Sequence, residues 1–137
     1  MSLTPGDPKT FHADHFHTIT HPFWIPVRGS SMMPALRDGD KAKIQPVSRE
    51  SVLSFPPGTL ILFISTKLNE PVIHRLVGTG KHVVFEKGDQ SKIIRAVKPE
   101  SVVGMVTHLK RNGKERQVSL PFAWKLRKLL TISWLKS

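Results

Sequence analysis

The chain has 137 residues, 39% of them hydrophobic, with 21 lysines and arginines against 10 aspartates and glutamates. That length suits one domain with a modest core, and no run approaches the ~18 apolar residues that a membrane-spanning helix needs. Because the chain contains no cysteine, disulfides, thiol catalysis and thiolate metal sites are excluded.

The net charge of +11 favours anionic partners as a class, such as nucleic acid, anionic lipid or acidic polypeptide, although it can equally serve solubility alone. Aromatic residues make up only 7% of the chain and tyrosine is absent, so platforms for base stacking are few. We therefore do not expect nucleic acid as the partner.

Residues 1–21 are predicted to form a flexible arm, without the apolar stretch of a signal peptide. Asp14 is the one acid beside the histidines of this arm, and their spacing matches no closed set of metal ligands, so we predict no metal site. These histidines are His12, His15, His17 and His21.

Residues 22–120 are predicted to form a mostly β domain, because short runs rich in strand formers alternate with turn residues. The run at 59–65 is apolar almost throughout, which predicts a strand buried on both faces. Asn112-Gly113 is typical of a tight hairpin turn. The predicted strands cover 22–27, 40–45, 59–65, 71–78, 82–87, 99–106 and 117–120.

Residues 121–137 change character, because apolar residues recur there at helical spacing among lysines and arginines. We expect a basic amphipathic helix. Its composition suits peripheral contact with a membrane surface, and a helix that covers one end of the β domain is an equal alternative.

A serine-rich turn is the most informative stretch of the chain. Gly29 allows a sharp bend, Ser31 follows it, and Pro34 suits the first turn of a short helix. The backbone N–H groups of Gly29, Ser30 and Ser31 would then be free to bind an oxyanion. A serine at this point is also compatible with a plain helix cap.

A serine hydroxyl needs an adjacent base to act as a nucleophile. The predicted strand at 71–78 places Val72, His74 and Leu76 on one face. His74 is the candidate base, because a neutral imidazole can accept a proton near pH 7. The alternative is a histidine packed in the core and bonded to backbone.

The stretch Gly29-Ser30-Ser31-Met32-Met33-Pro34-Ala35-Leu36, followed by Gly39-Asp40, resembles the Gly-x-Ser-Met-x-Pro-x-Leu…Gly-Asp box of type I signal peptidases. Their clan includes the self-cleaving LexA-type repressors. Residues 72–77 resemble the His-Arg form of the next box, 85–89 the Thr-Lys-Gly-Asp segment, and 102–106 the Val-x-Gly strand.

This resemblance implies Ser31 as nucleophile and His74 as base, with Asp89 matching an aspartate that supports the histidine. The chain departs from the family at Thr59, at Ser91 and in lacking a second aspartate, so Asp89 can instead be a structural turn residue. The resemblance also implies an apolar substrate groove, whose candidates here are Trp24, Ile25, Val27 and Met32. Ordinary core residues are an equal alternative for Trp24 and Ile25.

The expected fold is therefore a compact signal-peptidase/LexA-like β domain with coiled sheets, one short helix after the nucleophile and the C-terminal amphipathic helix. The expected function is a serine endopeptidase with a Ser-His dyad and no cofactor, which cuts a signal, leader or other precursor peptide. The alternative is a peptide-binding or regulatory module with weak catalysis on the same fold. Because the family's N-terminal anchor is not seen in this sequence, we expect a cytoplasmic or peripheral membrane protein, or one whose anchor is missing from the sequence.

Overall fold

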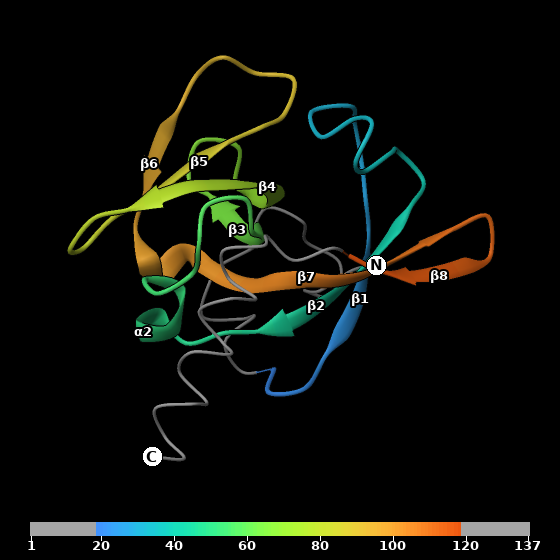
Figure 1. Cartoon of the computed structure of the whole chain (residues 1–137), viewed down its shortest axis with the longest axis horizontal. Helices are drawn as coiled ribbons and strands as arrows, with labels where there is room; N and C mark the ends of the chain where they lie inside the picture. Colours follow the sequence, from blue (N-terminus) through green and yellow to red (C-terminus); the bar gives the residue numbers. More distant parts are fainter. Residues whose placement is uncertain (1–18, 119–137) are drawn as a thin grey trace, which may run out of the picture.

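The computed structural model describes residues 19–118 of the chain. The expected C-terminal helix and most of the N-terminal arm lie outside these residues. The described part is mostly β, a curled antiparallel sheet that forms half a barrel (Figure 1). No helix within it is long and apolar enough to cross a membrane.

Eight strands form one sheet in the order β1-β2-β7-β3-β4-β5-β6, with β8 paired to β7. Two short helices, α2 and η2, complete the described elements. Their bounds are β1 Phe23–Pro26, β2 Lys41–Pro46, α2 Arg49–Val52, β3 Leu60–Ser65, β4 Glu70–Thr79, β5 Val84–Lys87, β6 Arg95–Val97, η2 Pro99–Ser101, β7 Val102–Arg111 and β8 Lys114–Gln117.

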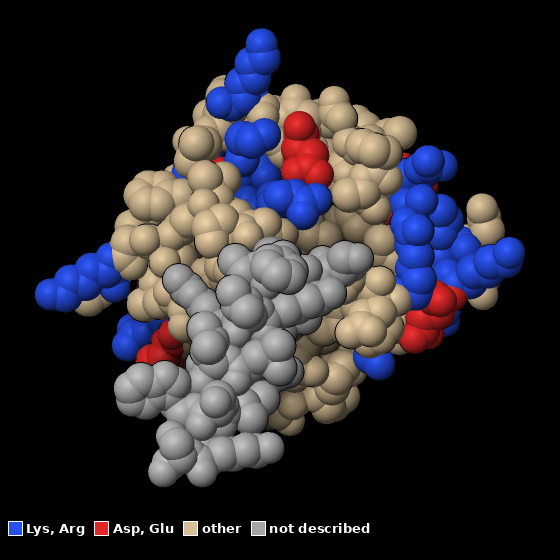
Figure 2. All heavy atoms as spheres, in the orientation of Figure 1, with Lys and Arg blue, Asp and Glu red and all other residues tan. Residues whose placement is uncertain are grey.

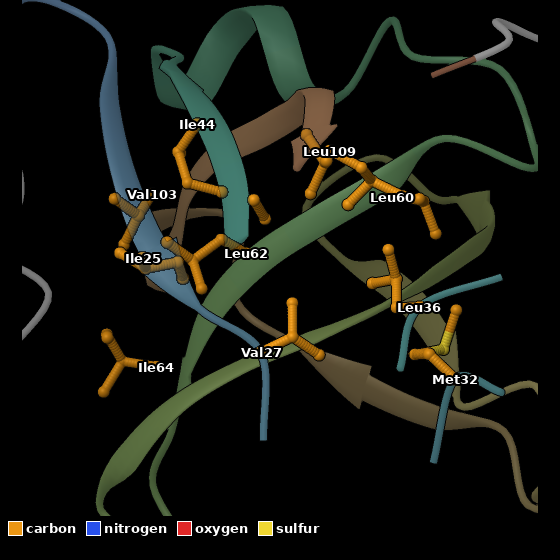
Figure 3. Close-up of a cluster of buried hydrophobic side chains, with 12 residues drawn as sticks. Ile25, Val27, Met32, Leu36, Ile44, Leu60, Leu62, Ile64, Val103 and Leu109 are labelled. Atoms are coloured by element: carbon orange, nitrogen blue, oxygen red, sulfur yellow. The ribbon is translucent and has the colours of Figure 1, made fainter. Parts of the chain in front are cut away.

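β3 is the central strand, and its side chains enter two hydrophobic clusters on opposite faces. Leu60, Leu62 and Ile64 belong to the larger cluster (Figure 3), and Ile61 and Phe63 belong to the smaller one. All five are buried, which confirms the predicted strand with two covered faces. The predicted hairpin is also confirmed, because Asn112 and Gly113 both have positive φ between β7 and β8.

The short helix predicted after Ser31 is wrong. Residues 31–35 form consecutive turns. The Met33 N–H donates to the Ser30 carbonyl at 3.2 Å and the Leu36 N–H to the Met32 carbonyl at 2.9 Å. Pro34 has no N–H and cannot extend the ladder. A helix occurs instead at α2, between the strands predicted at 40–45 and 59–65, where Ser48 and Ser51 form a reciprocal cap.

Candidate functional site

The loop between β1 and β2 carries Ser31 and lies beside the turn that follows β5, on the same side of the sheet (Figure 1). The Gln90 N–H donates to the Ser31 carbonyl at 2.9 Å, and the Gln90 side-chain amide donates to the Met33 carbonyl at 2.6 Å. Two segments about sixty residues apart in sequence are therefore joined at the serine itself.

Two aspartates fix the base of this loop. Asp38 accepts a hydrogen bond from the Gly29 N–H at 2.8 Å. Asp40 is buried and accepts one from the Arg37 N–H and two from the Arg111 guanidinium. The hydrogen bonds from Arg111 hold the pKa of Asp40 below its ordinary value, against the opposing effect of burial. The Gly-Asp end of the serine box thus acts as a structural anchor.

His74 lies on β4 and is oriented by Glu86 on β5. Its Nδ1 is 2.7 Å from the Glu86 Oε1, and its ring packs edge-on against Phe63, with centroids 5.8 Å apart. The Glu86 residue is only 3% exposed. Since a carboxylate only accepts hydrogen bonds, Nδ1 is the donor in this contact, and Nε2 is the ring nitrogen left for a second partner.

The Nε2 of His74 and the backbone of Ser31 both lie next to Gly88. A Cβ built on Gly88 would lie 3.1 Å from this nitrogen and 3.3 Å from the Ser31 carbonyl oxygen. The ring of His74 and the loop that carries Ser31 therefore meet at Gly88, which has no side chain and so leaves room for both.

Ser31 is exposed, and its hydroxyl makes no hydrogen bond to His74 or to another of residues 19–118. Exposed side chains change rotamer within nanoseconds, and catalytic hydrogen bonds in substrate-free enzymes are often longer than in the complex. The structure thus brings both residues to one place without joining them.

Asp89 does not occupy the position expected for it. Both of its carboxylate oxygens accept hydrogen bonds from Arg75, each at 2.9 Å, and Arg75 also donates to the Gly58 carbonyl. The hydrogen bonds from Arg75 hold the pKa of Asp89 below its ordinary value. Asp89 braces the turn that carries Gln90, while Glu86 makes the contact with the histidine that was expected of Asp89.

Sequence reasoning missed Glu86, because the apolar Phe85 beside it hides the alternation that the structure shows. Val84 and Glu86 alternate with exposed Phe85 on a short strand, so both point to the buried side. A carboxylate on a buried strand face requires a partner, and β4, the neighbouring strand, offers His74.

The three backbone donors expected around the serine differ in availability. The Gly29 N–H is occupied by Asp38. The N–H groups of Ser30 and Ser31 donate to no atom of the described residues. Two candidates for an oxyanion contact therefore remain, at a turn and not at a helix end.

A cleft of about 1010 Å³ contains Ser31, His74 and Glu86 in its lining. Of the four residues predicted for the groove, Ile25, Val27 and Met32 line this cleft and Trp24 does not. Strand alternation turns Trp24 to the other face of β1, where the ammonium of Lys110 lies 4.7 Å from the ring centroid.

One edge of β4 borders the cleft. Within residues 19–118, residues 70–74 of β4 pair with β3 only, because pairing with β5 begins at Arg75. Unpaired edges of this kind accept extended peptides through main-chain hydrogen bonds.

Among residues 19–118, no group of three or more histidine and carboxylate side chains is placed to hold a metal ion. Of the histidine-rich stretch, only His21 lies within the described residues. No protein-family model and no curated protein matches the chain.

Proposed function

We propose that the protein is a serine endopeptidase that uses Ser31 as nucleophile and His74 as general base. The observation that carries the proposal is the convergence of an exposed serine and a carboxylate-oriented histidine in one cleft. Acyl transfer to a serine requires a nucleophile, a base and a third group that orients the base.

In the proposed mechanism, Nε2 of His74 takes the proton from the Ser31 hydroxyl while Oγ attacks the scissile carbonyl. Glu86 fixes the ring through Nδ1 and stabilises the imidazolium that forms. The free N–H groups of Ser30 and Ser31 stabilise the oxyanion. His74 then protonates the leaving amine, and water activated by the same ring hydrolyses the acyl-enzyme.

The substrate is proposed to be an extended peptide that lies along residues 70–74 of β4. The apolar lining from Ile25, Val27 and Met32 supports an apolar side chain next to the scissile bond. The resemblance to signal peptidases supports a signal, leader or other precursor peptide.

The test is cleavage of a mixed peptide library, read by mass spectrometry, with and without anionic lipid vesicles. We expect the wild-type protein to cut at defined sites and the Ser31→Ala and His74→Ala variants to lose at least ~10³-fold in rate. Ser30→Ala is the matched control and should keep cutting. Cleavage that survives Ser31→Ala would contradict the proposed nucleophile.

The second candidate is a peptide-binding module with weak or no catalysis. The missing hydrogen bond between Ser31 and His74 favours it, as does the absence of the family's second aspartate. It predicts that library peptides bind in the cleft and stay intact, and that Ser31→Ala leaves their affinity unchanged.

A further inference from the structure

The rim of the cleft carries four exposed cations, one on each of four segments. No one of them forms an ion pair within the part of the chain that the structure describes. Two carboxylates also line the cleft: Glu86 is committed to His74, which leaves Glu70 as the acid open to a ligand. The cations are Arg28, Lys67, Arg95 and Lys98.

These cations lie on both walls beside the proposed dyad. Arg28 precedes Ser31 by three residues, on the wall formed by the loop after β1. Arg95 on β6 is the cross-strand partner of Glu86, on the wall that holds His74. One residue of an extended chain spans ~3.3 Å, so both arginines can meet side chains within a few residues of the scissile bond.

A cleft with charges of one sign and low-dielectric walls concentrates ligands of the opposite sign. We propose that the cleft selects an acidic peptide, with aspartate or glutamate within a few residues of the scissile bond and an apolar side chain on the cleft floor. This inference rests on the proposed function, because it assumes that the bound peptide is cleaved. The charge selection itself is a property of the cleft.

Basic side chains are not confined to this cleft. Figure 2 shows lysines and arginines in several separate groups on the visible face, one of them at the right, over the β7–β8 hairpin. The experiment therefore needs a control that removes the same number of charges elsewhere.

The binding probe is a short fluorescein-labelled peptide of leucine, alanine and glutamate, compared with its twin in which glutamine replaces every glutamate. Fluorescence anisotropy gives both dissociation constants for the full chain carrying Ser31→Ala, which prevents cleavage. The test variant adds R28Q, K67Q, R95Q and K98Q. The control adds K41Q, K81Q, K114Q and R116Q, whose positions lie outside the cleft lining.

We expect the acidic peptide to bind at least ~10-fold more tightly than its twin at low salt, which corresponds to about 1.4 kcal/mol. The test variant should reduce this ratio to about 2-fold or less, and the control should keep it. High salt should weaken the preference by screening.

The inference is overturned if both peptides bind alike, if the test variant keeps the preference, or if the control loses it equally. It is also overturned if random-sequence duplex DNA displaces the acidic peptide and binds more tightly through the same four cations. Cleavage of the unlabelled peptides by the wild-type chain is read separately. If the wild-type chain cuts both peptides equally well, only this inference fails. If the acidic peptide binds preferentially but no cleavage depends on Ser31, only the proposed endopeptidase function fails.

Discussion

At the scale of single residues, the proposed chemistry depends on the contact between His74 and Glu86. The buried carboxylate beside Nδ1 orients the ring, and in the proposed mechanism it also stabilises the positive ring that follows proton transfer. Neither effect requires Asp89, whose oxygens are both engaged by Arg75.

Glu86→Gln tests this contact. The amide oxygen can still accept the hydrogen bond, but it carries no charge to stabilise the imidazolium, so we expect kcat/KM for peptide cleavage to fall by about 100-fold. Glu115→Gln, on exposed β8, is the control and should cleave normally. A Glu86→Gln variant with the wild-type rate would show that the carboxylate does not serve the histidine.

At the scale of elements, the site is the meeting of the β1–β2 loop with the turn after β5. Gly88 is the point of closest approach, because an added Cβ there would lie 3.1 Å from His74 Nε2 and 3.3 Å from the Ser31 carbonyl. The contact with the serine is backbone, which cannot rotate away.

We therefore expect Gly88→Ala to separate serine and histidine and to lower the cleavage rate by about 10-fold or more, with little change in the far-UV circular dichroism spectrum. Gly78→Ala is the matched control, since its Cβ would meet nothing within 4 Å. Equal rates for the two variants would contradict the proposed convergence.

The elements that the sequence predicted correctly are those with a strong local pattern. The unbroken apolar run of β3 and the Asn112-Gly113 turn can both be predicted from a few adjacent residues. β6 was not predicted because it is an edge strand with two exposed residues, Arg95 and Ala96, so no period-2 signal exists.

The candidate site was predictable only in part, for a related reason. Ser31 and His74 were identified from their own segments. The contact between His74 and Glu86 depends on the pairing of β4 with β5, whose register shifts between Leu76 and Gly78. The turn geometry after Ser31 depends on Gln90. Long-range pairing of this kind leaves no mark in a short window of sequence.

At the scale of the whole molecule, two arginine–aspartate pairs join distant parts of the chain to the site. Asp40 and Arg111 tie the serine loop to β7, and Asp89 and Arg75 tie the following turn to β4. In both aspartates the arginine holds the folded-state pKa below the ordinary value.

This direction fixes the pH dependence of stability. A carboxyl with a lowered folded-state pKa stabilises the fold fully above its ordinary pKa of ~3.9, and this stability is lost as the pH falls through the lowered value. We expect the free energy of unfolding, from urea titrations, to decrease as the pH falls from about 5 to about 2.

The Asp40→Asn variant should be less stable near neutral pH. Its free energy of unfolding should also decrease less steeply toward acid pH, because only one of the two carboxyls with a lowered pKa remains. Asp38→Asn, at an exposed position of the same loop, is the comparison and should keep the wild-type slope. A free energy of unfolding that rises as the solution becomes acidic would contradict the role given to both pairs.

The central claim is that the Ser31 hydroxyl attacks a carbonyl with the help of His74, and trapping the acyl-enzyme tests it most directly. The wild-type chain is mixed with an activated peptide ester, quenched in acid during the first turnover and analysed by intact mass and fragmentation. We expect an added acyl mass on Ser31 in the wild type, and none in Ser31→Ala or, over the same time, in His74→Ala. An adduct on another residue, or one that forms equally fast without His74, would contradict it.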